Sequence, residues 1–580
     1  MSLFSHVTTN NDIIKLILER KPYMNHLSKY IRIFLIIVAV FLLSQSNANS
    51  VWADTIGERH TFFVDSSYDV TGRTSIPATL EYVGVHSYFY VDDLYLSSLN
   101  SRERAIFNQQ IIASAQEFDD NIYPKGTAFW GSETNPGIDN DPKVTILLER
   151  LTTGTGGYFD SANGYSKSQT DFTNQREMIT ANISSLNTGY LKIFLAHEFQ
   201  HLISANQKEI LRNVFEDTWL NELRSQYAIT VAGYNDDFQN SDLLQRAQTF
   251  VNNPTDSLTE WPNTNLDYAS VTLFGQYLVD RFGPGILQDT LRSPFVGINS
   301  IDKYLSDHQN LERFNDVFAD WEWTNYFDNC IPDIRYCYVN QNLQAIHVSL
   351  TDNEQLTSNN PNPYVYLLKP WQSSWYQFKI DPSAPAGQNI KISWPSSVFQ
   401  VYYADASGAE RRLGNGDVIT LPPAGSFILM PINSSKTSSF GASEASTQLS
   451  LSIEYTTQTL TSLVTTVSDG SLIMHAGTPD IYVVTGTYKR YLAPDVLKFY
   501  GLDASQAVMV TEAVFQSYMP ANYIRAVDEK KVYAVWPDGT KHWLNMTAQH
   551  FTDSYRDWNS VFIVNSLESN FYKIGSDITQ

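Results

Sequence analysis

Hydrophobic and polar positions in the first third of the chain alternate between strand and helix patterns. Short apolar runs at 60–64 and 143–148 predict strands, and the segment 177–183 predicts a further strand. Residues 101–118 have helical spacing and predict one long helix. Up to about residue 185 the pattern therefore predicts an α+β lobe.

The following region is predicted to be almost entirely helical, from 190 to 329. At its start, apolar side chains recur at helical spacing and give the first helix a buried side, namely Leu191, Phe194, Leu195 and Leu202. Residues 267–282 and 311–326 predict two of the later helices. The chain thus changes from an α+β lobe to a helical lobe at about residue 190.

A third region begins after a polar Asn/Pro linker at 358–363. Alternating runs at 390–394 and 449–455 are divided by Gly, Pro and Ser turns, and no helical period is visible. These short strands predict a β-sandwich domain of residues 361–457.

The last region, 465–580, is repeated internally. Residues 481–484 resemble 532–535, and residues 489–492 resemble 541–544, with a period of 51 to 52. Two copies are too few for a solenoid, so a tandem pair of β-rich units is expected. Binding of a surface or polymer by the C-terminal β-domains is a weaker hypothesis, because their aromatic residues are more often core residues.

The N-terminus has the pattern of an export signal. Two basic residues precede an apolar run at 33–43, and small residues offer cleavage points after Ala48 or Ala53. The run is short for a membrane span, which favours a cleaved signal peptide within 1–53 and no stable membrane insertion afterwards. Because the segment before the run is long for such a signal, translation could begin at Met24.

Composition narrows the classes of partner. With 61 acidic and 39 basic residues, the net charge is −22, which disfavours nucleic acid and anionic lipid as partners. The only two cysteines, Cys330 and Cys337, have six residues between them and predict one local disulfide in an oxidising compartment, with free thiols as the alternative.

The strongest chemical signal is the pentapeptide His197-Glu198-Phe199-Gln200-His201. On a helix, two imidazoles four residues apart point to the same side and can bind one metal ion. Glu198, beside the first histidine, can reach a metal-bound water and act as a general base. The spacing therefore indicates a zinc hydrolase, with His197 and His201 as ligands.

A third ligand is expected from a second helix. The segment 216–228 begins with a cap-type cluster and continues with helical residues, so Glu222 can face the first helix. Catalytic zinc takes three protein ligands and leaves one position to water, and two histidines with one glutamate form a standard set.

In these motifs the chain resembles the gluzincin clan of zinc metallopeptidases, and most closely its hyicolysin-type family of bacterial secreted peptidases. The likeness rests on 197–203, 156–159 and 174–179, and it spans roughly 60–345. It implies a metallopeptidase domain at 54–345, in which zinc lies in a cleft between an α+β lobe and a helical lobe. It also implies that the strand at 177–183 is an edge strand that pairs with an extended substrate.

The resemblance further assigns individual residues. Glu222 matches the third ligand, and Tyr268 matches a tyrosine that stabilises the oxyanion in related gluzincins. Asn221 and Gln226 are the side chains expected to orient the ligands. Gln226 stands where the thermolysin-like branch has an aspartate, and an amide raises the basicity of an imidazole less than a carboxylate does.

Together these observations predict a multidomain protein whose α+β and helical lobes form a gluzincin-like zinc peptidase, followed by a β-sandwich and a β-rich repeat module. The predicted function is a secreted zinc-dependent endopeptidase that acts on proteins or peptides with one Zn²⁺, extracellular or retained at the cell surface. The alternatives are an aminopeptidase of the same clan and a cell-surface adhesin with a vestigial peptidase fold. Asp139 and Asp141 could hold calcium, but the sequence contains no EF-hand loop, and a solvated turn explains these residues better.

Overall fold

The structure is a computed structural model. It describes residues 53–579 apart from 309–311, 331–333, 357–361, 382–388, 397, 406–409, 421–424, 457–466, 468, 476–479, 528 and 554–555. The chain divides into Met1–Asp54 and a compact unit, Thr55–Gln580. The apolar run of the predicted signal peptide lies outside the described residues. Among the described residues, no helix is long and apolar enough to cross a membrane.

The first lobe of the compact unit is built on a six-stranded sheet in the order β1-β2-β3-β4-β6-β5. Its strands are β1 (Arg59–Phe63), β2 (Ser75–Val83), β3 (Ser87–Asp92), β4 (Val144–Glu149), β5 (Gly157–Tyr158) and β6 (Met178–Asn182). β3, β4 and β6 are parallel, and the remaining pairs are antiparallel. All residues of β3, β4 and β6 are buried, which explains their continuous apolar pattern.

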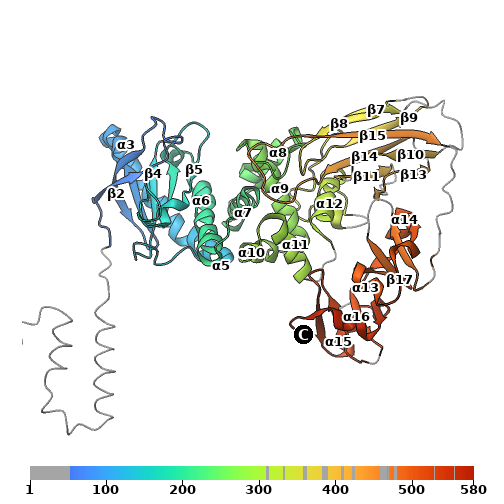
Figure 1. The fold of residues 1–580 in the computed structure, drawn as a ribbon. Coiled ribbons are helices and arrows are strands. Elements are labelled where there is room, and N and C mark those ends of the chain that lie inside the picture. Colours follow the sequence, from blue (N-terminus) through green and yellow to red (C-terminus); the bar gives the residue numbers. More distant parts are fainter. Residues whose placement is uncertain are drawn as a thin grey trace, which may run out of the picture. The chain divides into compact units, whose positions relative to one another are not determined.

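Helices lie against this sheet (Figure 1), and their side chains share one hydrophobic core with it. The first are α3 (Asp93–Ser98), α4 (Ser101–Glu117) and α5 (Tyr123–Trp130), followed by α6 (Leu191–Ala205), which packs against β6 and α5. Asn100 and Glu103 form a capping box that fixes the start of α4. The predicted helix at 101–118 thus begins at the predicted residue.

The predicted edge strand is in a different place. The strand expected at 177–183 is β6, but β6 lies between β4 and β5, and the edge is formed by β5. The sequence did not reveal β5 because it has only two residues, Gly157 and Tyr158, too few to display an alternating pattern.

The second lobe is helical, as predicted. It consists of α7 (Thr218–Val231), α8 (Asp242–Asn252), α9 (Asn265–Phe282), α10 (Gly285–Leu291), α11 (Gly297–Asp307) and α12 (Phe314–Phe327). α9 packs against both α7 and α8. After α12, a disulfide joins Cys330 and Cys337, whose Cα atoms are 5.0 Å apart.

Nine strands then form two sheets in the orders β13-β10-β15-β8 and β12-β11-β14-β9-β7. All neighbouring strands are antiparallel except β7 and β9, which are parallel. The strands are β7 (Asp352–Leu356), β8 (Tyr364–Leu368), β9 (Tyr376–Ile380), β10 (Asn389–Ser393), β11 (Phe399–Asp405), β12 (Glu410–Leu413), β13 (Val418–Thr420), β14 (Ser426–Asn433) and β15 (Thr447–Thr456). Side chains of both sheets share one core, so the pair is a β-sandwich. It starts at Asp352 rather than at the predicted 361, because β7 precedes the polar segment that looked like a linker.

Some side chains of the β-sandwich belong to the same hydrophobic core as the helical lobe. Trp371 is fully buried, and its ring lies 4.6 Å from that of Phe314 and 5.4 Å from that of Phe318 in α12. Its carbonyl accepts a hydrogen bond from the Leu258 amide at 3.0 Å, in the loop before α9. The sandwich therefore packs directly against the helical lobe.

The C-terminal region contains two units with the same topology. In the first, β16 (Leu472–His475), β17 (Ile481–Thr485) and β18 (Tyr488–Leu492) are antiparallel, and β19 (Val508–Val510) and β20 (Met519–Pro520) add in parallel at the two edges. In the second, β21 (Tyr523–Ala526), β22 (Tyr533–Val535) and β23 (Thr540–Asn545) are flanked in the same way by β24 (Val561–Val564) and β25 (Lys573–Ile574). The sequence repeat is thus a structural repeat.

Each unit also contains two short helices, which the sequence pattern did not reveal. They are α13 (Pro494–Lys498) and α14 (Glu512–Gln516) in the first, and α15 (Ala548–Asp553) and α16 (Ser566–Phe571) in the second. Helices this short carry too few residues to show a period of 3.6. With these helices and sheets, the predicted multidomain architecture of mixed helices and sheets is confirmed.

Replacing Trp371 by alanine tests the shared core. Loss of a fully buried tryptophan should lower the free energy of unfolding by about 3–5 kcal/mol, and the sandwich and helical lobe should lose structure in one transition. Chemical denaturation followed by near-ultraviolet circular dichroism measures both. Trp558→Ala, at a side chain 46% exposed, is the control. A Trp371→Ala protein whose helical lobe unfolds as in the parent would contradict the shared core.

Candidate metal centre

The two histidines and the glutamate of the pentapeptide lie on α6, a helix that is buried along most of its length. Leu191 and Leu195 are almost completely buried, while His197 and His201 keep side-chain exposures of only 11% and 9%. A helix of this kind must be covered on several sides. The sheet, α5 and α7 cover it, so both imidazoles are held within a packed interior.

Glu222 projects from α7 toward the two histidines. Its Oε2 atom lies 3.2 Å from His197 Nε2 and 3.4 Å from His201 Nε2, and the two Nε2 atoms are 3.1 Å apart. The three side chains form a group that could hold a metal ion. The helical lobe thus supplies the one ligand that α6 lacks.

These separations fit a small tetrahedral ion. Ligand atoms bonded to such an ion at about 2.0–2.1 Å lie about 3.3–3.4 Å from one another. Glu222 Oε2 is also buried and accepts no hydrogen bond, although a buried carboxylate oxygen normally has a partner. Two imidazole nitrogens and an unpartnered carboxylate oxygen suit zinc better than calcium, which prefers oxygen ligands only.

The charges of Glu222 and His201 shift each other's pKa. Burial alone would raise the pKa of Glu222, but the neighbouring imidazoles of His201 and His197 lower it well below its usual range. Burial lowers the pKa of His201, and Glu222 more than offsets this, so that the pKa is raised. Glu222 is therefore an anion, which is the form that binds a cation.

Glu198 lies next to this group and against β5. Burial raises the pKa of its carboxyl, opposed by the two imidazoles. A Cβ atom on Gly157 would lie 2.9 Å from Glu198 Cγ and 3.0 Å from its Oε1. Only glycine at position 157 therefore leaves Glu198 room beside the edge strand.

Ser225 of α7 orients His201. Its hydroxyl lies 3.1 Å from His201 Nδ1 and donates to Gln200 Oε1 at 2.5 Å. Because the serine proton is used on Gln200, Nδ1 is assigned as the donor to the serine oxygen, and His201 Nε2 is left with a lone pair for a metal. No sequence pattern marks Ser225, since a lone serine on a helix carries no signal of its own.

The two residues expected to orient the ligands differ in position. Asn221 lies close enough to His201 to raise its pKa, and its Oδ1 accepts a hydrogen bond from Ser204 at 2.7 Å. Gln226 instead faces α9, where its Oε1 lies 3.4 Å from the Thr272 hydroxyl, which donates to the Tyr268 carbonyl at 2.6 Å. Among the contacts of the described residues, Gln226 makes no hydrogen bond to either histidine, since it lies on the side of α7 that α9 covers. Its role as an orienting residue stays a prediction.

Tyr268 lies near the metal centre on α9. Its ring centroid is 6.2 Å from that of His197, and its hydroxyl donates to Asn263 Oδ1 at 3.0 Å. Burial, and then the charges of Glu222 and Glu198, raise its pKa, so it stays a neutral hydrogen-bond donor.

A second tyrosine approaches the site from the first lobe. Tyr68 stacks on Tyr158 of β5 with ring centroids 5.0 Å apart. Burial raises its pKa, and the charges of Asp65, Glu198 and Glu222 raise it further, which places it within their electrostatic reach. Nothing in its loop sequence marked Tyr68 as part of the site.

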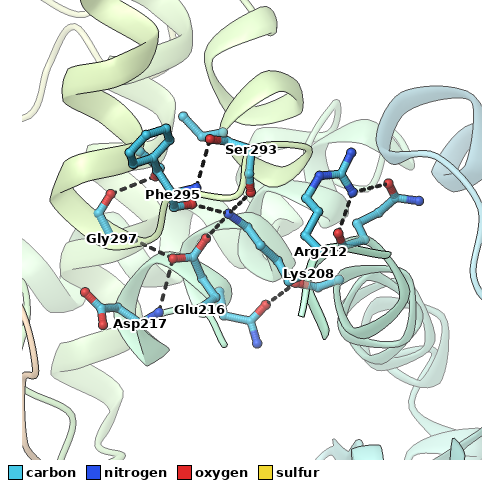
Figure 2. Close-up of polar contacts among 12 residues, drawn as sticks. Lys208, Arg212, Glu216, Asp217, Ser293, Phe295 and Gly297 are labelled. Atoms are coloured by element: carbon cyan, nitrogen blue, oxygen red, sulfur yellow. Dashed lines mark hydrogen bonds and ion pairs between the residues drawn. The ribbon is translucent and has the colours of Figure 1, made fainter. Parts of the chain in front are cut away.

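A buried ionic cluster connects the end of α6 to the start of α7 (Figure 2). Glu216 binds Arg224 at 2.7 Å and Lys208 at 3.1 Å, and it accepts hydrogen bonds from the amides of Asp217 and Gly297 at 3.1 and 2.6 Å. Lys208 also donates to the carbonyls of two residues after α10, Ser293 and Phe295. The segment between the two ligand-bearing helices is therefore fixed at one point.

The carboxylates of Asp139 and Asp141, which were considered as calcium ligands, accept hydrogen bonds from neighbouring residues. Asp139 Oδ1 accepts from the Asp141 amide at 2.9 Å, and Asp141 accepts from the Lys143 amide at 3.0 Å and from the Tyr88 hydroxyl at 2.8 Å. These bonds are those of a polar turn that caps the entry to β4.

Comparison with known proteins gives one informative likeness. No family model matches the chain. Over 266 residues the chain is 28% identical to the neutral metalloprotease ShpI of Staphylococcus hyicus, covering 41% of this chain and 56% of ShpI. The chain thus spans little more than half the length of that relative.

The solved structures that match include two periplasmic inhibitors of g-type lysozyme. PliG of Salmonella Typhimurium is 18% identical, covers 18% of this chain and 99% of its own, and has a TM-score of 0.15. A PliG mutant of Escherichia coli is 13% identical, covers 18% and 98%, and has a TM-score of 0.12. Scores this low support no argument about the fold.

Ser225→Ala tests how His201 is oriented. Removing the partner of a ligating imidazole typically lowers metal affinity by about 10- to 100-fold, so the zinc dissociation constant should rise by that factor. Competition with a chromogenic chelator measures it. Thr272→Val, which removes the hydroxyl beside Gln226, is the matched control and should leave the constant unchanged. If Thr272→Val has the larger effect, Gln226 is the orienting residue after all.

Proposed function

We propose that this protein is a zinc-dependent metalloendopeptidase. The observation that carries the proposal is the convergence of His197, His201 and Glu222 on one point, with the Glu198 carboxylate beside it. The 28% identity to a neutral metalloprotease over 266 residues supports the same class of activity.

Zinc is the proposed ion because the donor set is two imidazole nitrogens and one carboxylate oxygen at tetrahedral separations. Both cysteines of the chain are joined in a disulfide outside this group. When bound there, zinc would supply a Lewis acid that polarises a carbonyl and lowers the pKa of water. Three protein ligands leave a position open, as in catalytic sites.

Glu198 is the proposed general base. It accepts a proton from the water that attacks the scissile carbonyl carbon, and it donates that proton to the amine nitrogen as the peptide bond breaks. Its position against Gly157 supports this role, because a substrate lying along β5 would pass directly over the carboxylate.

The open edge of β5 is the proposed binding site for the substrate backbone. The Asn182 amide donates to the Gly156 carbonyl at 2.8 Å, so position 156 faces β6. In an antiparallel pair the next residue faces the other way, which leaves the amide and carbonyl of Gly157 toward the open edge. An extended peptide can pair with them and continue in both directions, as endopeptidase cleavage requires.

The alternatives are less well supported. An aminopeptidase needs a carboxylate to bind the free amine of its substrate, and the acidic residue directly before β6 is Glu177. That side chain is 5% exposed, and its Oε1 accepts from the Ile138 amide at 3.2 Å at the end of β6 away from Asn182. A vestigial fold would not need to keep the ligands and Glu198 together.

Secretion belongs to the proposal and rests on the N-terminal sequence pattern and on the disulfide. A local disulfide is typical of proteins in oxidising compartments. The domain limits proposed from the sequence change at one point, since β7 assigns residues from Asp352 onward to the β-sandwich.

Glu198→Gln tests the base. The amide keeps the shape of the side chain but cannot accept the proton, so turnover should fall at least about a hundredfold while zinc content is retained. Hydrolysis of casein and of a blocked fluorogenic peptide, with metal analysis of the same sample, measures both. Near-normal turnover in a purified, zinc-loaded variant would remove Glu198 from the mechanism.

Paired substitutions of the two tyrosines test oxyanion stabilisation. If Tyr268 donates to the developing negative charge, Tyr268→Phe should lower kcat by roughly ten- to a thousandfold with little change in KM. Tyr68→Phe is the matched variant from the other lobe and should have a smaller effect. Steady-state kinetics on one peptide compare them. A larger loss of kcat in Tyr68→Phe would transfer the role to Tyr68.

A further inference from the structure

A pocket lies between the helical lobe and a loop of the β-sandwich, at the N-terminal end of the helix α7 that carries Glu222. Its volume is about 120 Å³, and it is lined by Asp217 and Thr218 at the start of α7, by Trp261, and by Phe440 with the two residues that follow it. Phe440 belongs to the loop between β14 and β15. Two domains therefore build this pocket together.

The pocket is linked to the metal ligands in two ways, through the helix α7 and through a series of aromatic contacts. Thr218 and Glu222 are four residues apart on α7, hence on the same face, about 6 Å along the helix. On the other side, the Trp261 ring packs edge-on against Tyr268 at 5.1 Å, and Tyr268 lies 6.2 Å from His197. An extended peptide advances about 3.3 Å per residue, so the pocket lies within a few substrate residues of the metal centre.

The sandwich side of the pocket is held firmly to the helical lobe. The Trp261 amide donates to the Gly441 carbonyl at 3.1 Å, and the Glu444 amide donates to Glu260 at 3.0 Å. Trp371, in the shared core, donates to the Lys436 carbonyl at 2.6 Å. The loop carrying Phe440 is therefore a fixed wall of the pocket.

The charge in the pocket comes from Asp217. Figure 2 shows its amide bonded to Glu216 while its carboxylate points away from that cluster. The carboxylate makes no cap hydrogen bond to α7 and no ion pair within the described ranges. Burial and the neighbouring Glu216 raise the pKa of Asp217, opposed by Trp219 and Lys436. The Lys436 ammonium group is paired with Glu444 at 2.5 Å and lies 5.6 Å from the centre of the Phe440 ring. The Asp217 carboxylate thus lines the pocket together with two aromatic rings, and its Oδ2 packs against Gly297.

We propose that this pocket selects a lysine or arginine side chain of the substrate. The rings of Trp261 and Phe440 would cover the aliphatic stem and attract the cation through their π faces, and Asp217 would pair with the charged end. This inference rests on the proposed peptidase function and deepens it, because it names the substrate feature and makes the β-sandwich a part of substrate recognition.

The test compares two blocked fluorogenic peptide libraries with the full zinc-loaded chain. They differ only in carrying lysine or leucine at each position flanking the scissile bond. The parent should prefer lysine at one position by roughly tenfold or more in kcat/KM. Asp217→Asn should abolish that preference by lowering kcat/KM for the lysine peptide only, with zinc content unchanged. Asp289→Asn, at a half-exposed carboxylate of α10, is the matched control.

Phe440→Ala isolates the contribution of the β-sandwich. It should raise KM for the preferred lysine peptide several-fold, leaving kcat and zinc content near the parent values. A parent that cleaves peptides without any preference for lysine or arginine would overturn the inference, as would an equal loss on both peptides in Asp217→Asn. If the zinc-loaded parent cleaves no peptide, the peptidase function itself fails, and the inference fails with it.

Discussion

The packing of α6 against α7 is the interaction on which the site depends. It brings His197 and His201 from one helix and Glu222 from the other to within 3.1–3.4 Å of one another in a nearly buried setting. Burying these groups costs free energy unless a cation or hydrogen bonds compensate. Polar contacts hold this geometry. Ser225 contacts His201, and the Lys208–Glu216–Arg224 cluster fixes the segment between α6 and α7.

The same constraint gives the β-sandwich a place in the working unit. α7 is covered by α9, and the loop before α9 is bound to the sandwich through Leu258 and Trp261. Trp371 extends the core of the helical lobe into the sandwich. The wall beside the metal centre therefore depends on residues far along the chain, and a peptidase domain ended at 345 would expose that core to water.

Long, regular patterns were readable from the sequence, whereas contacts set by tertiary packing were not. The spacing in α6, the continuous apolar run of β4 and the repeat in the last region each carried a local signal, and the structure has the corresponding elements. Glu222 was found because zinc chemistry demands a third ligand. By contrast, β5 is too short for a pattern, and Ser225 and Tyr68 acquire their roles only from neighbours distant in sequence. Gln226 was assigned by position, and in the structure it lies on the side of α7 that α9 covers.

X-ray absorption at the zinc edge, combined with metal analysis of the dialysed full chain, identifies the ligands of the metal. We expect one zinc ion per chain with nitrogen and oxygen ligands at about 2.0–2.1 Å and no sulfur. We also expect Glu222→Ala to lose most of this zinc under the same dialysis, because only two protein ligands remain. Zinc bound through sulfur at about 2.3 Å, or full zinc retention in Glu222→Ala, would contradict the assignment of the site.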